Sequence, residues 1–280
     1  MIFEHEIPSG SKLYFGKSAS LKREIENIAS DILIKENFDE ILTPNFSFAK
    51  HQGIDNERDL IKLNNENNDF IALRADSTLD VVRIIENRLG RSVENKKWFY
   101  IQPIFTYPTN ESYQIGAEWI GNSNIEDVLN ILIKILQKLE LNSTLQITNN
   151  NIATIIAKEL SIDLNIFKTQ NIKELLELNC DWLNELIYVQ YSKDLEKVVD
   201  KVPSSLKEEL EKLLKVAKSI DYKELIISPL YYSDRSYYDG VLFRFLKDNR
   251  VLATGGNYRD DDLHSSGFAL HTDSLIEELI

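Results

Sequence analysis

Five side chains, at three places in the sequence, have the chemistry to bind a small amino acid. Asp76 and Glu118 are carboxylates, which can hold a primary ammonium group by charge-assisted hydrogen bonds. Tyr237 and Tyr238 present flat apolar faces with a polar tip, which suits an aromatic or imidazole ligand. The amide of Gln114 can both donate and accept a hydrogen bond. These residue types describe an amino-acid pocket, and their spacing alone leaves open whether they meet.

The elements that carry these side chains follow from local patterns. Gln114 and Glu118 are four residues apart on a strand expected at residues 113–120, so their side chains lie on one face. Asp76 and Thr78 stand where a strand passes into a helix within residues 68–91, and short polar side chains at such a junction cap backbone N–H groups. For each group alone, the simpler reading is a solvated sheet face or a helix cap.

Two arginines and two glycines are candidate supports for the pocket. Arg74 or Arg235 could meet the carboxylate of a bound ligand. Gly255 and Gly256 follow the tyrosine pair in the segment "ATGGNYRD". Paired glycines are a weak signal, because turns use them constantly.

The wider pattern indicates an α+β fold. Helical spacing at residues 18–37 and 125–139 is interleaved with strands expected at 97–107, 113–120 and 143–149. Strand-like segments return between residues 224 and 256, and a strand at the end of the chain passes into a short helix. Because crossover helices do not separate these strands regularly, we expect an antiparallel sheet flanked by helices.

One part of the sequence differs in character from the rest. Residues 150–221 form successive helical stretches rich in Leu, Ile, Lys and Glu, and in the last of them Ser205 and Glu208 have the spacing of a capping box. We therefore expect a core made of residues 1–149 and 222–280, with residues 150–221 as an inserted, mainly helical subdomain.

Composition excludes several classes of protein. The net charge of −13 disfavours general nucleic-acid binding, which relies on lysines and arginines that release counterions. The single cysteine, Cys180, and four histidines exclude a disulfide framework and a Cys/His metal cluster, and we expect neither a metal nor a cofactor. The start "MIFEHEIPSGSK" lacks the features of a secretory signal and no apolar run is long enough to span a bilayer, so we expect a cytoplasmic protein.

Six segments, in their order and wording, resemble the catalytic core of histidyl-tRNA synthetases, which have a class II synthetase fold. "FDEILTP", "FTYPTNESYQIGAEWIG" and "GFALHTDSL" are similar to the three class II motifs. "LRADST" is similar to the family's Leu-Arg-Pro-Glu-x-Thr segment, "SDRSYYDGVLF" to its Arg-Gly-Leu-Asp-Tyr-Tyr-Thr-Gly signature, and "GGNYRD" to its Gly-Gly-Arg-Tyr-Asp. The resemblance covers residues 1–145 and 222–280 and implies a histidine pocket.

The departures from that family concern its cations. Thr106 stands for the arginine of the second motif, Ser274 for that of the third, and Ser233 and Ser236 for the arginine and aspartate of the histidine signature. In aminoacyl-adenylate formation such arginines neutralise phosphate charge, and losing one preorganised group of this kind costs about 10²- to 10³-fold in rate. Arg235 could replace one of the three arginines but not all of them. We therefore expect no activation chemistry and no catalytic residue.

A class II synthetase-like core that lacks these arginines resembles the ATP phosphoribosyltransferase regulatory subunits. Histidyl-tRNA synthetases also carry a further domain that reads the anticodon, which we do not expect here, since the sequence ends at Ile280. The resemblance implies a homodimer that joins short-form catalytic subunits in a hetero-octamer. It also implies a role in their activity and in histidine feedback, within the first enzyme of histidine biosynthesis.

The resemblance further implies which residues contact histidine, and two alternatives remain beside it. The ligand contacts are Asp76, Thr78, Gln114, Glu118, Tyr237 and Tyr238, with Arg74, Arg235, Gly255 and Gly256 in support. Histidine as effector could bind in this chain, on the partner or between them. The alternatives are a class II-like ligase that activates histidine and a synthetase paralogue that binds tRNA, although the acidic charge argues against tRNA as a partner.

Overall fold

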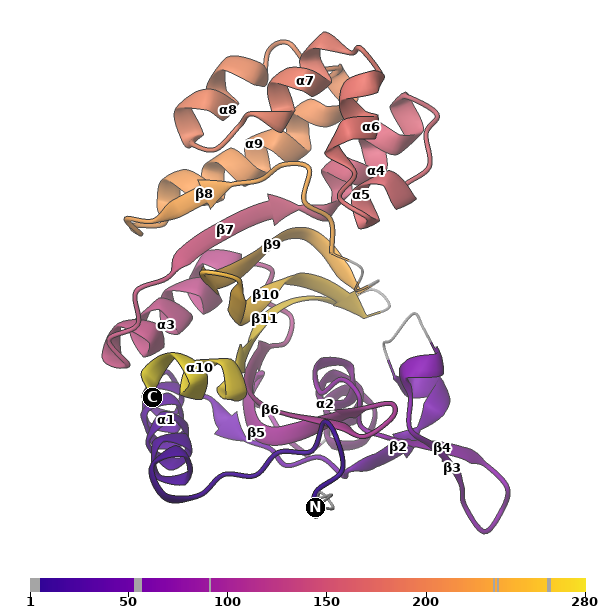
Figure 1. Cartoon of the computed structure of the whole chain (residues 1–280), viewed down its shortest axis with the longest axis vertical. Coiled ribbons are helices and arrows are strands. Elements are labelled where there is room, and N and C mark those ends of the chain that lie inside the picture. Colours follow the sequence, from indigo (N-terminus) through magenta and orange to yellow (C-terminus); the bar gives the residue numbers. More distant parts are fainter. Residues whose placement is uncertain (1–5, 53–56, 91, 234, 236, 261–262) are drawn as a thin grey trace, which may run out of the picture.

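The computed structural model describes residues 6–52, 57–90, 92–233, 235, 237–260 and 263–280. Its centre is an eight-stranded mixed sheet in the order β1-β5-β6-β11-β10-β9-β7-β8 (Figure 1). The strands of this sheet, in that order, are Asp39–Glu40, Lys97–Thr106, Asn110–Trp119, Leu263–His271, Arg250–Asp260, Tyr238–Lys247, Thr144–Asn149 and Leu225–Ile227. The inner pairs are antiparallel and the outermost pairs, β1–β5 and β7–β8, are parallel. The expected α+β fold is confirmed, with parallel pairing added at both edges.

Helices cover the two faces of the sheet unequally. α1 (Gly16–Lys35), α3 (Ile125–Lys138) and α10 (Thr272–Leu279) pack together on one face, against β6, β10 and β11. α2 (Thr78–Ile84), continued by a π-helical turn at Ile85–Leu89, packs on the other face against Trp98, Tyr100 and Tyr258. Because successive side chains of a strand point to opposite faces, Gln114, Gly116 and Glu118 lie on the α2 side of the sheet while Ile115 and Ala117 join the core on the other side.

A separate three-stranded sheet extends beside α2. It has the order β2-β4-β3, with β2 at Phe46–Phe48, β4 at Phe70–Leu73 and β3 at Lys62–Asn64. Short 3-10 turns at Ala49–His51 and Glu57–Asp59 lie between β2 and β3. The last strand of this small sheet in sequence, β4, leads directly into α2 through residues 74–77.

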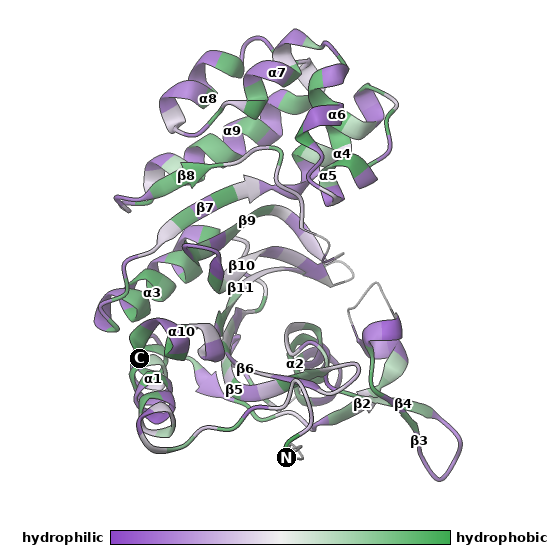
Figure 2. Ribbon diagram, viewed as in Figure 1, coloured by the Kyte–Doolittle hydropathy of each residue, from purple (hydrophilic) through white to green (hydrophobic). Residues whose placement is uncertain are grey.

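The helices of residues 150–219 lie at the far end of the main sheet, beyond β7 and β8 (Figure 1). They are α4 (Asn150–Glu159), α5 (Asn165–Lys168), α6 (Ile172–Glu177), α7 (Asp181–Ile187), α8 (Ser192–Val198) and α9 (Ser204–Ser219). In Figure 2 hydrophobic and hydrophilic residues alternate along α9, as expected for a helix with one buried face. One continuous cluster of buried apolar side chains runs from α1 and α3 through the sheet into α4 and α9. The division into a core and an inserted subdomain stays a prediction.

The expected cap of the last of these helices is wrong. α9 begins at Ser204, with Pro203 in the capping position and no side-chain hydrogen bond to the free N–H groups. The hydroxyl of Ser205 instead donates a 3.0 Å hydrogen bond to Glu159 Oε2 in α4. A tertiary contact has replaced the local one.

No helix among the described segments is long and apolar enough to cross a membrane.

We predict that the two parts of the chain unfold together, because they share one apolar cluster. Trp98 and Trp119 lie on core strands and Trp182 lies in α7, so a W98F/W119F variant and a W182F variant report on separate parts by fluorescence. Leu210 in α9 is fully buried, and Leu210→Ala should lower the stability seen by both reporters by about 2–5 kcal/mol in urea unfolding. The partly exposed Leu176→Ala is the matched control. A shift confined to the Trp182 signal would contradict the shared core.

Candidate functional site

The side chains predicted to bind a ligand do meet, in one cavity on the α2 side of the sheet. Asp76, Thr78, Gln114, Glu118, Tyr237 and Tyr238 all line it. Arg235 also lines this cavity, and among the described lining residues it is the one with a positive charge. The cavity has a volume of only about 20 Å³, which is room for a water molecule and not for an amino acid.

Asp76 is the hub of the polar contacts in this cavity. Its Oδ1 accepts a 2.8 Å hydrogen bond from the backbone N–H of Thr78, so Asp76 caps α2 as expected for this junction. Its Oδ2 forms an ion pair with Nη1 of Arg235 and accepts a 3.2 Å hydrogen bond from the hydroxyl of Tyr237. Burial raises the pKa of Tyr237 well above its ordinary value, and the negative charge of Asp76 adds to that rise, so this hydroxyl keeps its proton and can donate it.

Glu118 is a buried carboxyl group that forms no ion pair with the described part of the chain. The residue is 1% exposed, and its Oε2 has no hydrogen-bond partner among the described residues. Its Oε1 accepts a long 3.4 Å hydrogen bond from Tyr100. Burial raises the pKa of Glu118 to about 8, and the charge of Asp76 contributes in the same direction although nearby hydroxyl groups act against both. Glu118 is therefore a group that a cation or an N–H donor would satisfy.

Two glycines in the sheet make space for these side chains. Tyr100 on β5 pairs with Gly116 on β6, and a Cβ at Gly116 would overlap the tyrosine ring. Glu118 on β6 pairs with Gly267 on β11, where a Cβ would overlap its carboxylate. The Gln-x-Gly-x-Glu pattern thus places a glycine between the two functional side chains because a neighbouring ring crosses the strand at that point.

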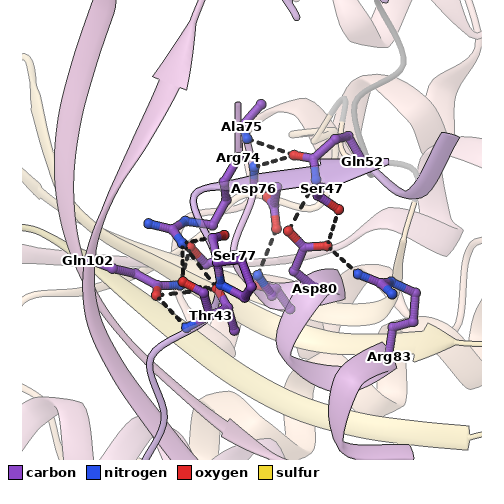
Figure 3. Close-up of polar contacts among 12 residues, drawn as sticks. Thr43, Ser47, Gln52, Arg74, Ala75, Asp76, Ser77, Asp80, Arg83 and Gln102 are labelled. Atoms are coloured by element: carbon purple, nitrogen blue, oxygen red, sulfur yellow. Dashed lines mark hydrogen bonds and ion pairs between the residues drawn. The ribbon is translucent and has the colours of Figure 1, made fainter. Parts of the chain in front are cut away.

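Arg74 is structural and does not reach the cavity. It is fully buried, and its guanidinium donates to the backbone oxygens of Thr43, Pro44 and Pro103 at 2.7–3.0 Å and to Asn45 Oδ1 at 3.1 Å. With its donors used in this way, Arg74 is not free to bind the carboxylate of a ligand. It fixes the segment that carries Asp76, as Figure 3 shows.

A second network behind Asp76 was not found from the sequence. Gln52 Oε1 accepts hydrogen bonds from the backbone N–H groups of Ala75 and Asp76, at 2.6 and 3.3 Å, while its amide donates to Asp80 at 3.1 Å (Figure 3). Asp80 is also held by Ser47 and Arg83, each at 2.9 Å. No local pattern around Gln52 signals this role, because its partners lie more than 20 residues away.

Two further residues that line the cavity come from β10. Thr254 and Tyr258 are four residues apart, so their side chains lie on one face of the strand. Gly255 and Gly256 lie inside this strand and not in a turn, packed against Phe243 and Leu242. Their support of the site is thus indirect, through close packing between β9 and β10.

The three positions that lack the family's arginines hold uncharged side chains in the described part of the chain. Thr106 ends β5 opposite Asn110, and Ser274 lies in the first turn of α10. The backbone of Ser233 exchanges two hydrogen bonds with the side chain of Asn150 in α4, at 2.9 and 3.2 Å. Ser236 lies outside the described residues.

His271 is a neighbour of the site that the sequence did not single out. It ends β11, paired with Gln114. Burial lowers its pKa to about 4, and the positive charge of Arg235 adds to the effect, so the imidazole is neutral at neutral pH. Within the described residues no group of three or more His, Cys, Asp or Glu side chains is arranged to hold a metal ion.

Comparisons with known proteins agree with this geometry. The family model described as histidyl-tRNA synthetase matches residues 16–275. The ATP phosphoribosyltransferase regulatory subunit of Wolinella succinogenes is 48% identical over 280 residues, which cover 100% of this chain and 98% of that protein. That of Helicobacter hepaticus is 43% identical, with 100% of both chains covered. The chain belongs to the family of ATP phosphoribosyltransferase regulatory subunits.

Solved structures show the same fold at lower identity. A crystal structure described as an ATP phosphoribosyltransferase regulatory subunit/histidyl-tRNA synthetase from Bacillus halodurans has a TM-score of 0.84 and 19% identity, and the match covers 100% of this chain and 84% of that one. A histidyl-tRNA synthetase from Nostoc has a TM-score of 0.80 and 14% identity, over 99% of this chain and 76% of that one. The class II synthetase-like fold of this regulatory-subunit family member is therefore confirmed.

We predict that Arg74→Met lowers the free energy of unfolding by at least about 3 kcal/mol, because buried carbonyl oxygens would lose their donors. The matched control is Arg250→Met, since Arg250 pairs with Glu277 and Glu278 at the surface, where such pairs contribute less than about 1 kcal/mol. Urea unfolding measures both. Equal losses in the two variants would show that Arg74 does not anchor the site.

We predict that Glu118 makes stability fall as pH rises. Between its ordinary pKa of 4.5 and its folded pKa of about 8, the folded state holds a proton that the unfolded state has lost, so stability decreases over this range and levels off above it. Glu118→Gln cannot ionise, and its stability relative to wild type should improve by on the order of 4 kcal/mol between pH 5 and pH 9. Exposed Glu66→Gln is the control. Parallel pH profiles for wild type and Glu118→Gln would refute the raised pKa.

Proposed function

We propose that this chain is a non-catalytic regulatory subunit that binds the short-form catalytic subunit of ATP phosphoribosyltransferase. The catalytic subunit needs this chain for its activity and for feedback inhibition by histidine. Identity along the full length to proteins of that name supports the partner. One observation carries the non-catalytic role: the cavity keeps its amino-acid-binding groups, while Thr106, Ser233 and Ser274 stand in place of phosphate-neutralising arginines.

The cavity is the proposed site for histidine as effector. Asp76 at the start of α2 offers a carboxylate to the ammonium group. The unpartnered Oε2 of Glu118 and the amide of Gln114 offer hydrogen bonds to the imidazole N–H groups, deeper in the sheet. Tyr237 and Tyr238, with ring centroids 4.9 Å apart, provide the apolar wall, and Thr78 lies beside Asp76. Histidine combines the three features that these groups select, namely an ammonium group, a flat ring and N–H donors.

A short chain of contacts connects this site to the helices of residues 150–219. Ser233 is two residues from Arg235 in sequence, and its backbone is bonded to Asn150 at the start of α4. The side chain of the adjacent Asn149 is bonded to Glu209 of α9, at 2.7 Å to its carboxylate. Histidine that altered the position of Ser233 or Arg235 would bias these helices, and a coupling of this kind amounts to about 1–3 kcal/mol.

The proposed assembly is a homodimer that joins catalytic subunits in a hetero-octamer in the cytoplasm. The small sheet offers a surface for the dimer. Phe46 and Phe48 of β2 and Leu63 of β3 are exposed on one face, because Phe48 and Leu63 both pair with Ile71 of β4. An exposed apolar face of this kind marks an interface, and a second copy of the same sheet would cover it.

We predict that phosphoribosyl transfer by the short catalytic subunit of the same organism requires this chain and is inhibited by histidine only in its presence. Asp76→Asn and Glu118→Gln should retain activation but raise the histidine concentration for half-inhibition by about tenfold or more, because each removes a ligand contact. Glu66→Gln, at an exposed position, is the control. Full activity of the catalytic subunit alone, or ATP–pyrophosphate exchange by this chain with histidine, would refute the proposal.

A further inference from the structure

We propose that Arg235 occupies the ammonium place of the pocket when no ligand is bound, so that a cationic ligand must displace this arginine from Asp76. The inference rests on the proposed function of the cavity as a histidine site. It adds that the site is self-occupied, meaning that a side chain of the same protein fills it, and this lowers the apparent affinity for the effector. The two arrangements between which the effector shifts the population are then Arg235 on Asp76 and the ligand on Asp76.

The contacts of Arg235 are those expected of a bound cation. Its Nη1 pairs with Asp76 Oδ2 and lies 3.2 Å from the hydroxyl of Tyr237. Its guanidinium carbon lies 5.9 Å from the centre of the Tyr237 ring, at the outer limit of a cation–π contact. A carboxylate, a tyrosine hydroxyl and an aromatic ring therefore surround the charge, as they would surround an ammonium group.

The space that remains beside Arg235 does not admit an amino acid. With the arginine in place the cavity has about 20 Å³, which is room for a water molecule and not for an amino acid. The side chain of Arg235 is 36% exposed, whereas Asp76 is 5% exposed. The arginine is thus more exposed to solvent than the carboxylate it pairs with, and Arg74 cannot take its place because its donors bind backbone oxygens.

Arg235 serves only one of the two acidic side chains in the described lining of the cavity. Two acidic side chains, Asp76 and Glu118, line the cavity, and the described lining provides one cation for them. Arg235 pairs with Asp76, which leaves Glu118 Oε2 without a partner. Histidine would bring an ammonium group for Asp76 and ring N–H donors for Glu118, so it satisfies a group that the arginine does not reach.

The expected size of the effect follows from competition between two states. If the arginine occupies the site in 90–99% of molecules, the apparent dissociation constant of a cationic ligand is raised by about 10- to 100-fold over that of the empty pocket. Removing the arginine should recover that factor.

Histamine is the first probe, measured by isothermal titration calorimetry with the whole chain. It has an ammonium group and an imidazole but no carboxylate that a displaced Arg235 could hold. Arg235→Gln should bind histamine about 10- to 100-fold more tightly than wild type, while Arg235→Lys, which keeps the cation, stays close to wild type. The control is Arg259→Gln, on β10 and 57% exposed, which should not change the affinity. Equal or weaker binding by Arg235→Gln would overturn the proposal.

Ethylguanidinium is the second probe, and it does not depend on histidine. In Arg235→Ala it should replace the missing guanidinium and raise the melting temperature, and Asp76→Asn in the same chain should abolish the rise. Wild type and Arg259→Ala should show no rise, because their pocket is already occupied. Absence of a rise in Arg235→Ala would overturn self-occupancy.

The two probes separate this inference from the proposed function. Ethylguanidinium rescue without any binding of histidine or histamine would keep self-occupancy and refute the histidine site. A different result would keep the regulatory role and refute self-occupancy: the chain activates the catalytic subunit, but ethylguanidinium does not rescue Arg235→Ala and Arg235→Gln does not bind histamine more tightly.

Discussion

The buried guanidinium of Arg74 is the interaction on which the site depends. It binds the backbone oxygens of Thr43, Pro44 and Pro103 at once, and these segments are far apart in sequence. A charge buried among neutral carbonyl oxygens is stable only while every donor has an acceptor, so the geometry of this junction has little freedom. Asp76, two residues further along the chain, inherits that rigidity. The Gln52–Asp80 network fixes the same segment from the other side.

The rest of the site uses a different device, namely the removal of side chains. The glycines at 116 and 267 let Tyr100 and Glu118 lie across neighbouring strands, so that the pocket is sunk into the sheet. Its position makes Glu118 unusual, because its carboxyl group is buried on the α2 side of the sheet and is cut off from water. An acid in that environment remains largely protonated near neutral pH until a ligand supplies a donor, and binding and proton release are then linked.

Much of the site could be predicted from the sequence, because its residues belong to local patterns. Gln114 and Glu118 share a strand face by their spacing, and Asp76 caps α2 as the junction suggests. The pairing of Arg235 with Asp76 could not be predicted, since it joins residues 159 positions apart and no local rule selects it. The same holds for Gln52. The role of Gly255 and Gly256 could not be predicted for a related reason: their lack of side chains serves the packing of β9 on β10, which a sequence does not display.

The strand order has a consequence for the making of the protein. β10 and β11, which follow the other strands of this sheet in the sequence, lie in its middle, between β6 and β9. During translation the earlier strands therefore expose unpaired edges and an unfilled core, and the sheet closes only after the C-terminal hairpin has left the ribosome. Contacts of such long sequence separation also slow folding. A chain cut short before residue 250 would lack the centre of its sheet, and chaperones or proteases would meet it as an aggregation-prone intermediate.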